Sequence, residues 1–139
     1  MSISPRVVLV DAGPLFALID SRDQYHHRAH QELDDIYDGG WGFAVAWTTV
    51  AETYSLLARR IGVLTAQEWL EDLIRDFMVL PVSPDDYLTA IEHLRRFPDQ
   101  QFSLFDAIVY VLSRERGMPV WSFDHHFDVM SAQRWWPTE

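Results

Sequence analysis

The sequence contains no cysteine and no lysine, and each absence removes a class of chemistry. Without cysteine there is no thiol catalysis, no disulfide and no thiolate metal site, a composition that suits a reducing compartment. Without lysine the chain is neither a P-loop nucleotide hydrolase, which needs a lysine on the phosphates, nor a Schiff-base enzyme, which needs a lysine amine. All eleven basic residues are therefore arginine.

Long hydrophobic runs are also missing. The N-terminal segment offers only VVLV before Asp11 interrupts it, which is too short for a signal peptide or a membrane span. We therefore expect a soluble cytoplasmic protein with no membrane partner. Hydrophobic residues make up 48% of the 139 positions, enough for one packed core, and no repeat or linker divides the chain. The composition predicts a single domain over residues 1–139.

The net charge of −10 is the wrong sign for a protein that binds nucleic acid through a basic surface. Two explanations are open. Either nucleic acid is not the ligand, or metal ions make the phosphate contacts while the acidic surface attracts a basic partner.

Short apolar segments alternate with helical segments along the chain. We expect strands at 6–10, 43–47, 77–82 and 119–122 with a short edge strand at 134–136, and helices at 15–19, 25–37, 49–60, 65–76, 84–97 and 102–116. Strands that alternate with helices predict an α/β fold, in which helices cover both faces of a mostly parallel sheet of four to five strands.

Four acidic residues stand where apolar segments end. Asp11 follows VVLV, Glu52 follows FAVAWTTV, Asp106 lies in SLFDAIVYVL and Asp124 follows MPVWSF. Ligand sites of open parallel sheets form beyond the carboxyl ends of the strands, so we expect these acids to converge there. Carboxylates that converge repel one another unless a cation neutralises them, which predicts a divalent metal site. Hard oxygen ligands without thiolates favour Mg²⁺ or Mn²⁺ over zinc.

Helix capping is the alternative explanation for each acid taken alone. The segments 49–52 and 103–106 match the capping box, Asp124 could cap a short helix through Val129, and Asp11 could cap the turn that follows it. The two roles are compatible, because a helix N-terminus favours an ionised carboxylate by about 0.3–1 kcal/mol.

Four segments together resemble the PIN domain family and, within it, the VapC-type toxin ribonucleases. They are VVLVDAGPLFALIDSRDQYHHRA, TTVAETYSLLARR, FSLFDAIVYVLSRERG and PVWSFDHHFDVM, in this order. The resemblance implies a PIN-like three-layer sandwich and an Mg²⁺- or Mn²⁺-dependent endoribonuclease, the toxin of a type II toxin–antitoxin pair. It also implies that Asp11, Glu52, Asp106 and Asp124 are the catalytic, metal-binding acids.

The resemblance extends to further residues and to partners. Ser122 stands where the family often has Thr or Ser, which implies that it orients the metal-bound water or the phosphate. Asp128 is either an extra acid of the site or a solvated helix residue. The implied partners are an RNA substrate, a small antitoxin whose basic segment reaches the acidic pocket, and a second copy of the chain in a homodimer. The competing interpretation is a PIN-fold module that binds RNA or protein with weak or no nuclease activity.

Histidines and arginines offer further candidate sites. His26 and His30 are spaced i, i+4 and could share a zinc ion, but no third ligand is nearby, so we favour a solvated helix face. For His125 and His126 we favour a structural or surface role over the alternative that one of them lies near the phosphate. The arginine pairs at 59–60 and 95–96 end predicted helices, where they either complement the helix dipole or contact RNA; we favour the first for most of them.

Overall fold

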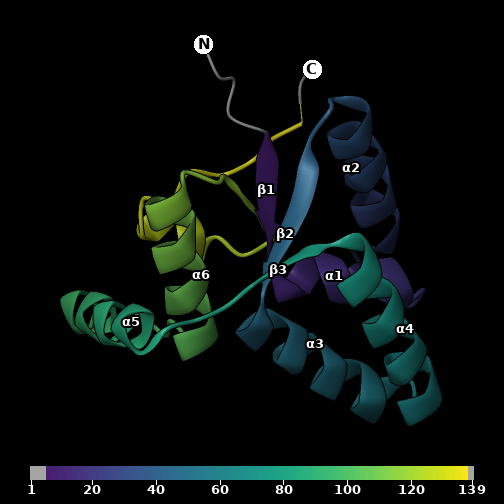
Figure 1. Ribbon diagram of the computed structural model, residues 1–139, viewed down its shortest axis with the longest axis horizontal. Coiled ribbons are helices and arrows are strands. Elements are labelled where there is room, and N and C mark those ends of the chain that lie inside the picture. The colour runs from purple at the N-terminus through teal and green to yellow at the C-terminus, as the bar shows by residue number, and fades with distance from the viewer. Residues whose placement is uncertain (1–5, 138–139) are drawn as a thin grey trace.

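The sheet consists of four parallel strands in a computed structural model that describes residues 6–137 (Figure 1). The strands are β1 (Val7–Val10), β2 (Gly42–Ala46), β3 (Met78–Leu80) and β4 (Val120–Trp121), in the order β3-β2-β1-β4. The prediction of a parallel sheet is confirmed. The predicted edge strand at 134–136 is reduced to a single parallel bridge between Val120 and Arg134. Pro137, which has no N–H to donate, follows closely and cannot extend the ladder.

Helices cover both faces of the sheet. Within residues 6–137 they are α1 (Ala12–Ile19), α2 (His26–Asp38), α3 (Trp47–Arg60), α4 (Val63–Asp76), α5 (Pro84–Arg96), α6 (Leu104–Arg116) and α7 (His126–Val129). In Figure 1, α1 to α4 lie on one side of the strands and α5 and α6 on the other. This is the three-layer α/β sandwich that the sequence predicts. None of the helices in the described part of the chain has the length and hydrophobicity to cross a membrane.

Alternate residues of each strand point into two different cores. Val8, Val10 and Trp121 belong to the core shared with α1 to α4, whereas Leu9 and Val120 belong to the core shared with α5, α6 and α7. Because side chains alternate across a strand and both faces are covered, every position of these strands must be apolar. This explains why the strands appear in the sequence as unbroken apolar runs.

The strand order creates a crevice at one place in the sheet. From β1 the chain moves outward to β2 and β3, and then returns to the opposite side of β1 to form β4. Strand order therefore changes direction between β1 and β4. In open parallel sheets, the crevice at such a switch point lies beyond the carboxyl ends of the strands. Asp11 directly follows β1 and Asp124 closely follows β4, so both lie at this crevice.

Helix α6 forms the centre of one core. Residues 107–113 are all buried, because nearly every side of this apolar segment is covered. Its first turn carries the predicted capping box of Ser103 and Asp106, and it ends at Gly117, whose φ of 65° is a conformation that glycine adopts without strain.

Candidate functional site

A pocket of about 360 Å³ opens at the switch point, and we call it the acidic pocket. Its lining residues are Asp11, Ala12, Gly13, Phe16, Asp23, Gln24, Tyr25, Glu52, Leu56, Asp106, Phe123 and Asp124. The four acids singled out in the sequence thus come together from four different parts of the chain, and Asp23 joins them. No arginine or histidine is among these lining residues, and the five charged side chains that line the pocket are all carboxylates.

Asp11 occupies the turn between β1 and α1. Its backbone N–H donates to the carbonyl oxygen of Trp121, which holds the end of β1 against β4. The side chain makes no capping hydrogen bond to α1 and is only 7% exposed. Burial raises the pKa of Asp11 to about 6, with the Ser122 hydrogen bond opposing the rise and the Asp106 charge adding to it.

The buried hydroxyl of Ser122 connects two of the acids. It donates a hydrogen bond to Asp11 Oδ2 at 2.8 Å and accepts one from the Asp124 N–H at 2.9 Å. A serine hydroxyl has one proton to donate, and Ser122 donates it in the hydrogen bond to Asp11. Ser122 therefore orients a carboxylate of the pocket and fixes the loop that carries Asp124.

Glu52 enters the pocket from the second turn of α3, and the predicted capping box at 49–52 is wrong. Helix α3 begins at Trp47 directly after β2, with Ala46 as its N-cap, so Thr49 already lies inside the first turn and cannot act as the N-cap. Burial, with a further contribution from the charges of Asp11 and Asp106, raises the pKa of Glu52 from 4.5 to about 7. Capping does not explain this acid.

Asp106 both closes a capping box at the start of α6 and lines the acidic pocket. Its Oδ2 accepts a hydrogen bond from the Ser103 N–H at 3.1 Å, and its own N–H donates to Ser103 Oγ at 3.0 Å. Burial nevertheless raises the pKa of Asp106, with the hydrogen bond from Ser103 opposing the rise and the charge of Asp124 adding to it. The capping box holds this carboxylate at the pocket while the neighbouring acids disfavour its charge.

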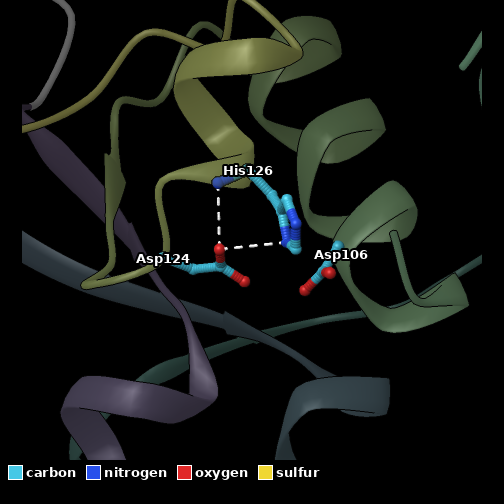
Figure 2. A group of neighbouring side chains, drawn as sticks. All are labelled: Asp106, Asp124 and His126. Atoms are coloured by element: carbon cyan, nitrogen blue, oxygen red, sulfur yellow. Dashed lines mark hydrogen bonds and ion pairs between the residues drawn. The ribbon is translucent and has the colours of Figure 1, made fainter. Parts of the chain in front are cut away.

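His126, for which we expected a structural or surface role, lies beside two acids of the site. Asp124 Oδ1 lies 3.1 Å from His126 Nδ1 and also accepts the His126 backbone N–H at 2.9 Å. One ligand atom each from Asp106, Asp124 and His126 lie within 4.8 Å of one another, and Figure 2 shows the three side chains converging. The available signal was the spacing Asp124-x-His126, which places an imidazole beside the carboxylate on the same turn. His125, by contrast, is exposed.

Asp128 lies outside the acidic pocket. Its Oδ2 accepts a hydrogen bond from Arg134 at 2.9 Å, and Arg134 also donates to the carbonyl oxygen of Ser122. In this structure Asp128 thus holds the arginine that braces the end of β4.

The His26–His30 pair is also engaged elsewhere. His26 Nδ1 lies 2.7 Å from the carbonyl oxygen of Ala17, and His30 Nε2 lies 2.9 Å from that of Leu18. These contacts attach α2 to the last turn of α1 and occupy one nitrogen of each ring. The pair therefore acts as a contact between helices rather than as the start of a zinc site.

The fold and the site together define an α/β domain with an acidic pocket at the switch point of a parallel sheet. The model of the PIN domain family matches residues 8–132, and the chain belongs to this family. The sequence matches none of the curated proteins.

Solved structures of the same fold include VapC20 from Mycobacterium tuberculosis, a toxin that cleaves the sarcin-ricin loop. It shares 24% identity at a TM-score of 0.81, over 94% of this chain and 99% of that one. A chain of VapBC2 from Rickettsia felis, bound to promoter DNA, shares 8% identity at a TM-score of 0.73, over 92% and 96%. A chain of DNA-bound VapBC from Salmonella typhimurium shares 13% identity at a TM-score of 0.69, over 94% and 96%.

Proposed function

We propose that this protein is a metal-dependent endoribonuclease that hydrolyses phosphodiester bonds of single-stranded or structured RNA. One observation carries the proposal: Asp11, Glu52, Asp106 and Asp124 line a single pocket that has no arginine or lysine among its lining residues. Burial and then the charges of neighbouring acids raise the pKa values of three of them, Asp11, Glu52 and Asp106, so keeping these carboxylates ionised here costs free energy. A fold that maintains such a cluster is suited to a bound cation.

The donor set fits Mg²⁺ or Mn²⁺. Asp11, Glu52, Asp106 and Asp124 would hold the ion through carboxylate oxygens, and His126 stands beside Asp124. When bound, such an ion lowers the pKa of water and neutralises charge on a phosphate. The protein supplies orientation: Ser122 fixes Asp11 and the Ser103 capping box fixes Asp106, so these carboxylates are positioned before the substrate arrives.

We further propose that the protein is the toxin of a type II toxin–antitoxin pair that acts in the cytoplasm as a homodimer. Similar folds occur in the VapC20 toxin and in VapBC complexes, which supports this role. The expected antitoxin is small and carries a basic segment, which the net charge of −10 favours.

A groove on the α1, α2 and α4 side offers a docking surface for the antitoxin. Its lining residues are Leu15, Leu18, Ile19, Leu33, Trp69, Asp72, Leu73, Asp76 and Phe77. Apolar side chains flanked by two carboxylates suit an amphipathic segment that carries basic residues. A basic side chain at the end of that segment would complement the acidic pocket. Co-purification with a small basic protein would support this proposal, and a freely active monomer from the native host would contradict it.

The nuclease proposal is tested by substituting Asp11→Asn and titrating Mg²⁺ and Mn²⁺ in a cleavage assay on single-stranded RNA. We expect the cleavage rate to fall at least about 100-fold, as when a transition state loses a preorganised electrostatic contact. The matched control is Asp99→Asn at an exposed position, which should cleave normally. Wild-type cleavage by Asp11→Asn would contradict the assignment. Calorimetry without any binding of Mg²⁺ or Mn²⁺ would instead favour a PIN-fold binding module.

A further inference from the structure

A second hollow of about 360 Å³ adjoins the acidic pocket, and we call it the side groove. Its lining residues are Ala51, Glu52, Ser55, Leu56, Arg59 and Phe105. Glu52 and Leu56 line both hollows, so a ligand that occupies the acidic pocket can extend directly into the side groove.

One face of α3 runs along both hollows. Glu52, Leu56 and Arg59 are spaced i, i+4 and i+7, which places them on the same side of the helix. Seven residues of helix correspond to roughly 10 Å along the axis, so the Arg59 side chain starts two turns away from the Glu52 carboxylate. The opposite wall is Phe105, the residue directly before Asp106 in the first turn of α6. Each wall of the side groove therefore carries an acid of the site at one end.

Phe105 and Arg59, on the two walls of the side groove, are available for a ligand. Phe105 is 38% exposed, although residues 107–113 of the same helix are buried. Arg59 is exposed and makes no ion pair or side-chain hydrogen bond with any residue in the described range. Arg28 and Arg75, in contrast, are held by carboxylates. The aromatic ring of Phe105 and the guanidinium of Arg59 thus line a groove that adjoins the acidic pocket.

We propose that the side groove binds the nucleotide adjacent to the scissile phosphate of single-stranded RNA. In this arrangement the base stacks on Phe105 and the neighbouring phosphate binds the guanidinium of Arg59. The inference rests on the nuclease function proposed above and assigns the residues that provide substrate affinity.

The chemistry of the chain explains why RNA affinity depends on so few residues. The acidic pocket itself repels phosphates, and the chain has eleven arginines and no lysine to offset 21 acids. The planar guanidinium suits a phosphate because it donates paired hydrogen bonds. Aromatic rings accept any base, because every base has a face that can stack. Arg59 and Phe105 together therefore bind RNA at this position without selecting its sequence.

The test compares Arg59→Gln and Phe105→Leu with the wild-type protein on a fluorescent single-stranded RNA in Mg²⁺. We expect KM to rise about five- to tenfold in each variant, from the loss of a charged contact or of base stacking, while kcat stays within about twofold. The matched control is Arg95→Gln, since Arg95 is another exposed arginine in the last turn of a helix, with no carboxylate partner in the described structure. Arg95→Gln should leave KM unchanged.

Binding measured without cleavage separates this inference from the nuclease proposal. In an Asp106→Asn background, fluorescence anisotropy should show that Arg59→Gln lowers the salt dependence of RNA binding by about 0.7 in log–log slope, equivalent to one phosphate contact. Normal KM and RNA binding in both variants, with cleavage intact, would overturn the inference and leave the nuclease proposal standing. If light scattering showed that Arg59→Gln or Phe105→Leu is a monomer while the wild type is a dimer, the inference would also be overturned, because a second copy of the chain would then occupy the side groove. If the wild type neither binds nor cleaves RNA, the nuclease proposal fails first.

Discussion

The hydroxyl of Ser122 donates a 2.8 Å hydrogen bond to the carboxylate of Asp11, although 111 positions separate the two residues. The same hydroxyl accepts the N–H of Asp124. A single side chain therefore joins the ends of β1 and β4 at the place where the strand order changes direction. This contact ties the Asp11 carboxylate to the loop that carries Asp124.

Ser122→Ala should lower both the free energy of unfolding and the affinity for Mg²⁺. The hydrogen bond from Ser122 lowers the pKa of Asp11, so its loss should raise that pKa further above about 6. We expect the free energy of unfolding at pH 7 to fall by about 1–2 kcal/mol, since a buried carboxylate loses a donor. Mg²⁺ affinity in calorimetry should fall severalfold.

Ser113→Ala is the control for Ser122→Ala. The buried hydroxyl of Ser113 donates to the carbonyl oxygen of Met118 at 2.6 Å, away from the acidic pocket. This variant should lose similar stability in urea but bind Mg²⁺ like the wild type. Equal Mg²⁺ affinity of Ser122→Ala and the wild type would show that Ser122 does not orient Asp11.

Asp106 and Asp86 provide a matched pair, because both are the third residue of a helix and close a capping box with a serine. The hydrogen bond from the Ser83 N–H holds the pKa of Asp86 below its ordinary value, whereas burial raises the pKa of Asp106. Asp86→Asn should therefore destabilise the metal-free protein by about 1 kcal/mol, and Asp106→Asn by less, because it also relieves repulsion. Thermal unfolding measures the difference.

Cleavage activity should show the opposite order for the same pair. Asp106→Asn removes a carboxylate of the acidic pocket, so RNA cleavage should be lost, whereas Asp86→Asn should retain it. Comparable activity of the two variants would mean that Asp106 serves only as a helix cap.

Glu52→Gln should change how the stability of the metal-free protein depends on pH. The folded-state pKa of about 7 exceeds the ordinary value of 4.5, so the folded protein binds a proton more readily than the unfolded chain. The contribution of protonated Glu52 to the free energy of unfolding is fully present below pH 4.5 and is lost as the pH rises to about 7. Glutamine carries no charge, so Glu52→Gln should match the wild type in acid and exceed its stability above pH 7. Allowing for solvent screening, the gain should be on the order of 1 kcal/mol.

Chemical denaturation at pH 4.5 and pH 8 in EDTA measures this effect. Glu68→Gln, an exposed position on α4, is the control and should show no such pH dependence. A constant difference between Glu52→Gln and the wild type at both pH values would contradict the raised pKa. Saturating Mg²⁺ should reduce the advantage of the variant, because the cation stabilises the ionised carboxylate.

Glu32→Ala should be among the more damaging substitutions outside the site. The buried carboxylate of Glu32 accepts hydrogen bonds from the Trp121 indole at 3.0 Å and from Arg28 Nε at 2.6 Å, and so connects α2 to β4. Its removal leaves the indole N–H buried without a partner, which should cost about 3 kcal/mol of unfolding free energy. Urea denaturation measures the loss against Glu71→Ala, an exposed control on α4. A loss below about 1 kcal/mol would contradict this role.

The fold was predictable because its signals are local. Unbroken apolar runs such as 7–10 and 43–46 indicate strands covered on both faces, and the turn at Gly117 ends α6 where the sequence predicts. The start of α3 was not predictable in this way. Thr49 and Glu52 match a capping box, yet β2 leads into the helix without a loop and the motif falls inside the helix. Tertiary packing prevails over a short motif at this boundary.

The sequence by itself determined the alternation of strands and helices, the absence of lysine and thiol chemistry, and the four acids that stand at the ends of apolar segments. Only the tertiary structure decided which of these acids share a pocket, that His126 joins Asp106 and Asp124, and that Asp128 pairs with Arg134 instead. The physical reason is that the strand order β3-β2-β1-β4 is set by packing between segments far apart in the chain. That order brings the end of β1 beside the end of β4, and no pattern within either segment specifies it.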